Sequence, residues 1–390
     1  MSFNIALSGI NAINKQLTIT SHNIANSGTV GFKSSRANFA TMVAGNQGGG
    51  TSVASVTQNI GGGDAGVVPT GRKFDAAIHG NGFFVTRNSE GATLFTRVGI
   101  FHRQDDYMVD GFGHRVQGYS VGGAYGDLHI PAGTSPAKAS TNLSYAGNLS
   151  ADVAVPKVQK FDMANEKSYS RKISSTVYDS LGVQHVLDQY FVKMATPPNT
   201  YQVHYGMNGA KVGETTVLTF DEQGALKGYS SGTVTVGGQA GAAALTIKVD
   251  HTGTTQYAGN STTTTNQDNG HAAGVPGEPT LDQQGNIVIP YSNGEKRTLG
   301  TLALATFPNP DGLETVGDTA WVAGSASGNP LLGKPGTGGV GVLEPGALEL
   351  SNADVTNELV TMMAAQRNYQ ANSKVLSIEN QMMQSLMQAL

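Results

Sequence analysis

The chain contains no cysteine, which excludes disulfide bonds, thiolate metal sites and a cysteine nucleophile. Charged residues are also scarce, at 13% of the 390 residues, against about 25% in average soluble domains. The net charge is -4, and no basic stripe is present. Nucleic-acid binding is therefore not expected, because it depends on clustered Lys and Arg side chains that meet phosphates.

Long hydrophobic runs are missing as well. No apolar stretch approaches the roughly 18 residues that a membrane-spanning helix needs, so we expect no membrane insertion. Residues 1–26 lack a basic region followed by an apolar block, which is the pattern of a cleavable signal peptide. If the protein leaves the cell, we expect a route that keeps its N-terminus intact.

Residue patterns that would support catalysis are weak. Two G-x-S-x-G matches are centred on Ser120 and Ser230, but chance predicts about half a match in so Gly-rich a chain, and no helical pattern follows either serine. The His residues are scattered singly, with no H-x-x-x-H pair. We therefore predict no enzyme activity, no catalytic or metal-binding residues and no cofactor.

Glycine is plentiful, with 52 residues, and most of the chain has the short alternating patterns of strands. Examples are residues 82–85, 93–97 and 107–109, and Asn293-Gly294 is a strong hairpin signal. Residues 45–66 have almost no charge and many glycines, which is typical of an extended connector. Residues 251–275 are rich in Thr, Gly and Asn, which indicates a loop.

The two ends of the chain differ from the middle, because their apolar residues recur every seven positions. This 3-4 spacing is typical of a narrow coiled-coil seam on a helix. At the start, Ala6 and Thr20 fill alternate positions, and Gly28 follows as an expected left-handed cap. At the end, Ser351 and Asp354 are expected to form a capping box. The predicted self-assembly seam consists of Phe3, Ile10, Ile13, Leu17, Ile24, Val355, Leu359, Met362, Tyr369, Leu376, Met383, Met387 and Leu390.

The predicted fold is therefore mixed: long terminal α-helices that form a coiled-coil-like inner domain, with two mainly β domains inserted between them. An alternative remains open at this point. The two helices could simply pack on each other inside a monomer, which would still leave apolar flanks exposed. A secreted β-rich binding or adhesive protein is a second alternative, although it would not explain the terminal heptads.

Several stretches resemble one family of proteins. HNIANSGTVGFK (residues 22–33) resembles the N-terminal signature of bacterial flagellar axial proteins, and the stretch 346–372, with LELSNADVTNELV and AAQRNYQAN, resembles their C-terminal signature. FDAAIHGNGFFV (residues 74–85) and VDGFGHRVQGY (residues 109–119) resemble the body shared by rod and hook proteins. STVYDSLGVQHVL (residues 175–187) and LATFPNPDGL (residues 304–313) resemble hook proteins in particular. The motif residues carried over are Asn23, Ile24, Ala25, Asn26, Gly31, Phe32 and Lys33.

The resemblance implies a structural subunit of the flagellar hook. Such a subunit would self-assemble into a hollow helical tube that links rod to filament and transmits torque as a flexible universal joint. A distal rod-type axial protein is the alternative within the family, but the large central insertion favours the hook. The implied partners are further copies of itself, the rod, hook cap and hook-filament junction proteins, and the type III export apparatus. The implied location is extracellular, in the hook of the bacterial flagellum.

The resemblance also implies nested domains. We expect residues 1–70 and 345–390 to form the inner helical polymerisation domain with its connector. Residues 71–146 and 277–344 would form a middle β domain, and residues 147–276 an outer β domain.

Overall fold

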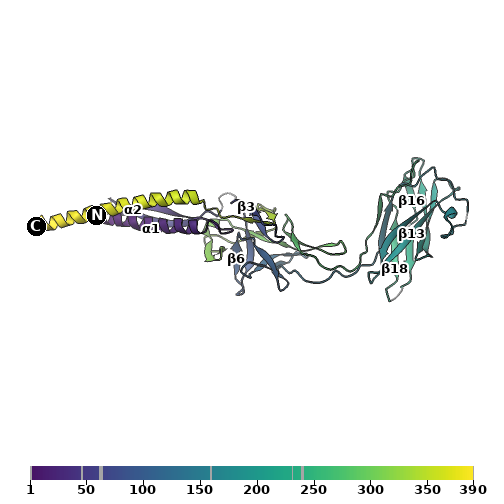
Figure 1. Ribbon diagram of the computed structural model, residues 1–390, viewed down its shortest axis with the longest axis horizontal. Helices are drawn as coiled ribbons and strands as arrows, with labels where there is room; N and C mark the ends of the chain where they lie inside the picture. The colour runs from purple at the N-terminus through teal and green to yellow at the C-terminus, as the bar shows by residue number, and fades with distance from the viewer. Residues whose placement is uncertain are drawn as a thin grey trace. The chain divides into compact units, whose positions relative to one another are not determined.

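The computed structural model describes residues 2–44, 47–60, 65–158, 160–230, 232–238 and 241–389. The chain divides into two compact units. Unit 1 comprises Met1–Ala132, Glu278–Pro290 and Lys296–Leu390, and unit 2 comprises Gly133–Gly277 and Tyr291–Glu295. Both ends of the chain are helices and most of the rest is strand, which confirms the predicted mixture of terminal helices and β structure (Figure 1).

The terminal helices are α1 (Ser2–Ala25) and α2 (Val355–Ala389). Helix α2 begins directly after Asp354, whose carboxylate accepts hydrogen bonds from the backbone N–H groups of Thr356 and Asn357 at 2.8 and 3.3 Å. Asp354 is thus the N-cap, because it satisfies N–H groups that have no partner within the helix. The expected capping box is wrong, since the Ser351 hydroxyl accepts from Ala353 instead.

The left-handed residue after α1 is Gly31 and not Gly28. Gly31 has a φ of 68°, whereas Gly28 has no positive φ. A Cβ atom at Gly31 would lie 2.9 Å from the backbone nitrogen of Val98. The position therefore needs glycine for its backbone conformation and also for this close approach of two backbone segments.

A β-hairpin follows α1. Strand β1 (Ser35–Ala44) pairs antiparallel with β2 (Gln47–Gln58), from Ser35 opposite Gln58 to Ala44 opposite Gln47. The expected connector over residues 45–66 is therefore wrong for 47–58, where β-branched Val and Thr residues favour a strand despite the glycines. The hairpin contacts α1, because the Ser8 hydroxyl accepts a hydrogen bond from the Thr51 N–H at 3.1 Å.

The remainder of unit 1 is a β body whose central strand order is β20-β21-β22-β9-β5-β6-β25-β24. Strands β4 and β27, and β3 and β28, form separate antiparallel pairs. The bounds are β3 (Val67–Pro69), β4 (Ala76–His79), β5 (Phe83–Arg87), β6 (Thr93–Thr96), β7 (Phe101–Gln104), β8 (Tyr107–Asp110), β9 (Arg115–Ser120), β10 (Tyr125–Asp127), β20 (Thr280–Leu281), β21 (Asn286–Pro290), β22 (Lys296–Leu302), β23 (Leu304–Thr306), η2 (Pro310–Gly312), β24 (Glu314–Gly317), β25 (Ala320–Val322), β26 (Leu331–Gly333), β27 (Val342–Pro345) and β28 (Ala347–Glu349).

The core of this body combines segments that are far apart in the sequence. Phe83 and Phe95 lie edge-to-face with Phe307, and Trp321 lies against Phe83. The Trp321 indole donates a hydrogen bond to Gln58 at 2.6 Å, which ties the end of β2 to the body. The segments before and after unit 2 therefore fold together, and the Asn293-Gly294 hairpin signal is confirmed between β21 and β22.

Unit 2 consists of two sheets that share one core. The first is an antiparallel sheet in the order β12-β13-β14-β15-β16, and the second has the order β17-β18-β11-β19. The bounds are β11 (Asn142–Ala146), η1 (Glu166–Ser168), β12 (Arg171–Tyr178), β13 (Gln184–Lys193), β14 (Thr200–Met207), β15 (Ala210–Phe220), β16 (Leu226–Tyr229), β17 (Gly232–Val236), β18 (Leu245–Asp250) and β19 (Thr265–Asp268). Strand β19 corrects the expectation that residues 251–275 are a loop throughout.

Candidate functional site

Helices α1 and α2 lie side by side and antiparallel (Figure 1). The Asn23 amide donates a hydrogen bond to the Glu358 carboxylate at 2.7 Å. Nearer the other end of α1, a Cβ atom on Gly9 would lie 3.1 Å from the Asn372 side chain. The alternative in which the two helices pack on each other within one chain is therefore correct for the isolated chain.

Some predicted seam residues of α1 are buried or half-buried in the structure, and others are exposed. Ile13 is buried, with 8% of its surface exposed, and Phe3 is exposed at 44%. Ile10, Leu17 and Ile24 are half-buried. The chain itself thus covers only part of the α1 seam.

The predicted seam residues of α2 are mostly uncovered. Met362 and Leu376 are half-buried. The exposed members are Val355, Leu359, Tyr369, Met383 and Met387. Leu390 lies outside the described residues. The side of α2 that faces α1 instead carries Glu358, Ala365 and Asn372, of which Ala365 is buried at 1% exposure.

A second set of exposed apolar side chains on α2 lies outside the predicted heptad positions. Its members are Val360, Val375, Ile378, Met382 and Leu386. Four of them, Val375, Ile378, Met382 and Leu386, follow one another at steps of three and four residues and therefore share a helix face. A search for this spacing outside the chosen heptad columns would have found these four.

The axial-family motif forms the junction between the helices and the β body. The Asn23 side chain is buried at 1% exposure and both accepts from and donates to the backbone of Ser35. Asn26 donates to the carbonyl of His22 and accepts from Thr29, which holds the turn after α1. Phe32 is buried, with its ring 5.5 Å from that of His22. Ile24 is half-buried and Ala25 is exposed.

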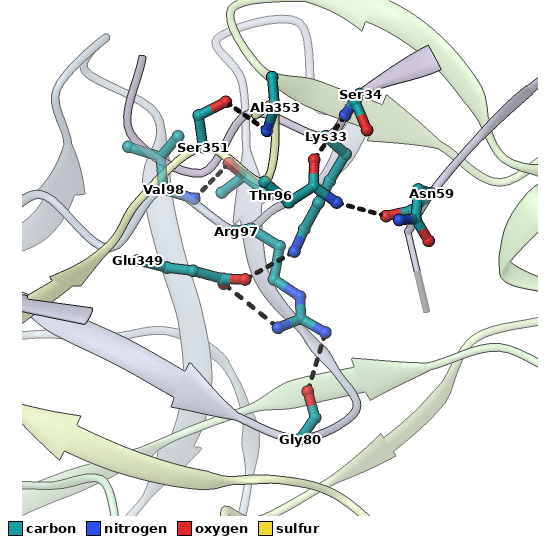
Figure 2. Close-up of polar contacts among 11 residues, drawn as sticks. Lys33, Ser34, Asn59, Gly80, Thr96, Arg97, Val98, Glu349, Ser351 and Ala353 are labelled. Carbon is teal, nitrogen blue, oxygen red and sulfur yellow. Dashed lines mark hydrogen bonds and ion pairs between the residues drawn. The ribbon is translucent and has the colours of Figure 1, made fainter. Parts of the chain in front are cut away.

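Figure 2 shows a buried ionic cluster at this junction. The Glu349 carboxylate accepts from the Lys33 ammonium at 2.6 Å and from the Arg97 guanidinium at 3.2 Å. Arg97 also donates to the Gly80 carbonyl at 2.9 Å, and its guanidinium lies 5.4 Å from the centre of the Phe83 ring. Two buried cations thus share one carboxylate, and the carbonyl and the aromatic face stabilise the excess positive charge.

Neighbouring polar contacts complete the junction. The Asn352 side chain accepts from the Ser34 N–H at 2.7 Å and donates to the Asn59 carbonyl at 2.9 Å. The Gly31 N–H donates to the Glu349 carbonyl at 2.8 Å. The segment after α1 and the segment before α2 are therefore joined to each other by backbone and side-chain bonds, and Glu349 also joins them to Arg97, which follows β6.

Other kinds of site find little support among the described residues. Ser120 and Ser230 are exposed, and the next element after each is a strand, so neither lies on a strand-to-helix elbow. The described ranges hold no cluster of three or more His, Asp or Glu side chains arranged to bind a metal ion. No helix within those ranges combines the length and the apolar character needed to cross a membrane.

Comparison with known families covers most of the chain. Residues 3–33 match the flagella basal body rod protein family, and residues 344–389 match the C-terminal family of flagellar basal body rod FlgEFG proteins. Residues 77–151 match the D1 domain of flagellar hook protein FlgE/F/G, and residues 148–271 match the D2 domain of flagellar basal body protein FlaE.

The chain is 37% identical to the flagellar hook protein FlgE of Salmonella typhimurium over 402 aligned residues, which cover 99% of both chains. It belongs to the flagellar hook protein family. The hook protein FlgE of Escherichia coli K12 is 36% identical, with 99% of both chains covered. That of Borreliella burgdorferi is 31% identical, with 97% of both covered. The protein is thus a structural subunit of the bacterial flagellar hook, and its recognition from sequence motifs is confirmed.

A solved structure supports the fold. The chain resembles the Helicobacter pylori flagellar hook protein FlgE2 with a TM-score of 0.55 at 14% identity. The match covers 72% of this chain and all of that one.

Proposed function

We propose that the chain polymerises through its two terminal helices into a hollow helical tube. The tube would link rod to filament and transmit motor torque as a flexible universal joint. Subunits that join head-to-tail with a rotation that does not close give an open helical filament. The terminal helices would form a coiled-coil-like inner domain, made of residues 1–70 and 345–390. The middle β domain (71–146 and 277–344) and the outer β domain (147–276) would lie progressively farther out.

The observation that carries this proposal is the exposed apolar surface of α2. Large side chains such as Leu359 and Tyr369 remain exposed although α1 lies beside that part of the helix, and Met387 is exposed as well. A concentration of large exposed apolar side chains on one element favours an interaction site. The predicted seam, from Phe3 to Ile24 and from Val355 to Leu390, would be covered by neighbouring subunits.

The buried junction around Glu349 would connect the polymerising helices to the β body. Three segments distant in the sequence supply Lys33, Arg97 and Glu349. A rigid junction of this kind passes force from one part of a subunit to another without local unfolding. The rod, hook cap and hook-filament junction proteins are the proposed partners at the tube's ends. The type III export apparatus is the proposed route to the cell exterior.

Deletion of the two helices alone tests the proposal. The fragment 26–353 keeps Lys33, Arg97, Glu349 and Asn352, so the junction retains its principal ion pairs. We expect a soluble monomer that melts cooperatively and forms no tubes, whereas the full-length chain at high concentration forms tubes visible by electron microscopy. Tubes from the fragment would overturn the proposal.

A further inference from the structure

Asn-Gly pairs occur in the chain at residues 81–82, 208–209, 269–270 and 293–294. Asparagine is a thermolabile residue. Before a glycine, its side-chain amide is open to attack by the following backbone nitrogen, because glycine carries no side chain that shields this nitrogen. The sequence does not distinguish these pairs from one another, but the structure does, because it holds the asparagine side chains in different ways.

The side chains of Asn269 and Asn293 are each fixed by several hydrogen bonds. The Asn269 amide accepts from the backbone N–H groups of Thr141 and Asn142 at 2.8 and 2.9 Å. It also donates to the Thr141 hydroxyl at 2.8 Å. The Asn293 amide donates to the Ala272 carbonyl at 2.8 Å and accepts from a backbone N–H at 3.1 Å. Attack on either side chain therefore requires these bonds to break first.

In the pair at 81–82, the attacking residue is confined. Asn81 is exposed, but Gly82 is buried. The Asn81 carbonyl accepts a hydrogen bond from the Gly341 N–H at 2.7 Å. This carbonyl belongs to the same peptide unit as the Gly82 nitrogen, so the bond restricts the rotation that would bring that nitrogen to the Asn81 side chain.

The pair at 208–209 differs from the others, because both of its residues are exposed. Asn208 and Gly209 form the two-residue turn between β14 and β15, with φ angles of 52° and 81°. No atom lies within 4 Å of a Cβ added to Gly209, so the space around the turn is open. Within the described part of the chain, the Asn208 side chain has one hydrogen-bond partner, His185, whose Nδ1 lies 3.3 Å from Asn208 Nδ2.

His185 is itself held by a carboxylate. Its Nε2 donates to Asp179 Oδ2 at 3.0 Å. Asp179 Oδ1 accepts from the backbone N–H groups of Leu181 and Val183, both at 2.9 Å. Because the carboxylate accepts the Nε2 proton, Nδ1 is the ring nitrogen that meets Asn208. The turn after β12 and the turn after β14 lie at the same end of the antiparallel sheet, which brings the Asp-His pair to Asn208.

We propose that Asn208 is a site of spontaneous deamidation, with His185 as the proton donor. The Gly209 nitrogen attacks the side-chain carbonyl carbon of Asn208 and releases its proton to water, which forms a five-membered imide. The bond from that carbon to Nδ2 breaks, and protonated His185 donates the proton with which Nδ2 leaves as ammonia. His185 recovers its proton from the solvent. One water molecule then opens the imide at either carbonyl and gives aspartate or isoaspartate, so that the amide and water become a carboxylic acid and ammonia.

The reaction alters a turn whose backbone suits Asn-Gly. A two-residue turn with two positive φ angles favours this pair, and isoaspartate adds a methylene group to the backbone there. Either product also adds a negative charge close to the Asp179–His185 pair. We therefore expect the β14–β15 hairpin to loosen near its turn as the protein ages. Helices α1 and α2 take no part, so this inference is independent of the proposed function.

Incubation of the purified full-length protein at physiological pH and temperature tests the site, with deamidation at each Asn-Gly pair measured by peptide mass spectrometry. We expect Asn208 to react at least about tenfold faster than Asn269 and Asn293, because those side chains must first lose hydrogen bonds. Asn208 should also react faster than Asn81. In denaturant all of these residues should react at similar rates, which is the control for sequence. Reaction of Asn269 or Asn293 as fast as Asn208 in the folded protein would overturn the proposal.

His185→Gln tests the proton donor. Glutamine can still form hydrogen bonds with Asp179 and Asn208, but it cannot transfer a proton. We expect deamidation of Asn208 to slow at least about tenfold, because general acid catalysis is lost, while Asn81 in the same sample reacts at its usual rate. Hydrogen exchange in β13 checks that the variant is folded. An unchanged rate at Asn208, or equal slowing at Asn81, would overturn the role of His185.

Discussion

Unit 2 and helix α2 differ in how far their large apolar side chains are buried. Unit 2 covers its large side chains by itself, and Phe191, Tyr201, Val203 and Ile247 are almost fully buried between its two sheets. Helix α2 has 35 residues, yet Ala365 is its only buried apolar residue among those described. The same chain thus contains a region whose large apolar side chains are mostly covered and a helix whose large apolar side chains are mostly exposed.

Under the proposed function, this difference separates the region that packs its own core from the region that assembles. Two packed layers around one core are a stable solution for a domain. A single pair of helices can cover only one side of each member. The stability of unit 2 should therefore depend on conditions that act on its own interior, whereas the helical region should respond to changes at the junction and at its exposed flanks.

Acidic pH should produce the largest difference in stability between unit 2 and unit 1. In unit 2, burial lowers the pKa of His251 to about 4, with Asp250 partly opposing the shift. Burial, with repulsion from Lys211, lowers the pKa of His204 to about 4. Because these histidines bind protons more readily when unfolded, stability falls as the pH drops from about 6.5 to about 4. At about 1.4 kcal/mol per pKa unit, protonation of the almost fully buried His251 alone should lower the free energy of unfolding by on the order of 3 kcal/mol at pH 4, and the less deeply buried His204 should lower it by less.

The measurement is denaturation of the full chain at several pH values. Hydrogen exchange in β13 reports unit 2, and the fluorescence of the single tryptophan, Trp321, reports unit 1. We expect acid to weaken protection in β13 more than it shifts the Trp321 transition. The variant His204→Gln should lose part of the acid sensitivity. Equal stability of unit 2 at neutral and acid pH would contradict the prediction.

Glu349→Gln should have the opposite effect: it should destabilise unit 1 and leave unit 2 unchanged. The change leaves the buried Lys33 and Arg97 cations without their carboxylate. Breaking a buried ion pair by removing one partner costs about 3–5 kcal/mol. The Trp321 transition should move to lower denaturant, while protection in β13 stays unchanged.

Glu344→Gln is the matched control for that variant. Glu344 pairs with His79, and both side chains are more than a third exposed. An exposed pair contributes about 0–1 kcal/mol, so the control should shift the Trp321 transition little. Equal effects of the two variants would show that burial at the junction is unimportant.

Gly31→Ala should have an intermediate effect on unit 1. The substitution places a Cβ atom in a left-handed backbone conformation and against the Val98 backbone at 2.9 Å. Such strain costs on the order of 1–3 kcal/mol. Gly28→Ala is the control, because no atom lies within 4 Å of its added Cβ. Chemical denaturation monitored at Trp321 compares the two, and a tolerated Gly31→Ala would argue against a tight junction.

Leu359→Asp should have the smallest effect on the folded chain. Leu359 is 46% exposed, and substitutions at exposed positions usually change stability by less than about 0.5 kcal/mol. Tube formation should nevertheless fail, since the predicted self-assembly seam would carry a charge. Ile13→Asp should differ, because Ile13 is buried within the chain and its substitution lowers helix content in the monomer. Normal hooks from Leu359→Asp would count against Leu359 as part of the seam.

The heptads at both ends and the alternation between them were sufficient to predict terminal helices around a β-rich middle. Spacing alone determines which side chains share a helix face or a strand face. The signature stretches identified the family because each is a continuous run of residues that can be recognised without the tertiary structure. The seam residues remain a prediction, since they concern contacts between copies of the chain.

Local patterns misjudged features that depend on a pairing or packing partner. Residues 47–58 contain several glycines, but pairing with β1 makes them a strand. Gly28 was the expected left-handed residue, yet Gly31 takes that conformation where the loop meets Val98. In both places a tertiary partner decided the structure.

The sequence by itself determined that the chain has apolar helical ends, a β-rich interior and no cysteine chemistry, because these follow from composition and short-range spacing. Only the tertiary structure decided that Lys33, Arg97 and Glu349 meet in one buried cluster. It also decided which flanks of α2 stay exposed beside α1. Contacts between residues hundreds of positions apart depend on how the whole chain folds, and no short-range pattern in the sequence specifies them.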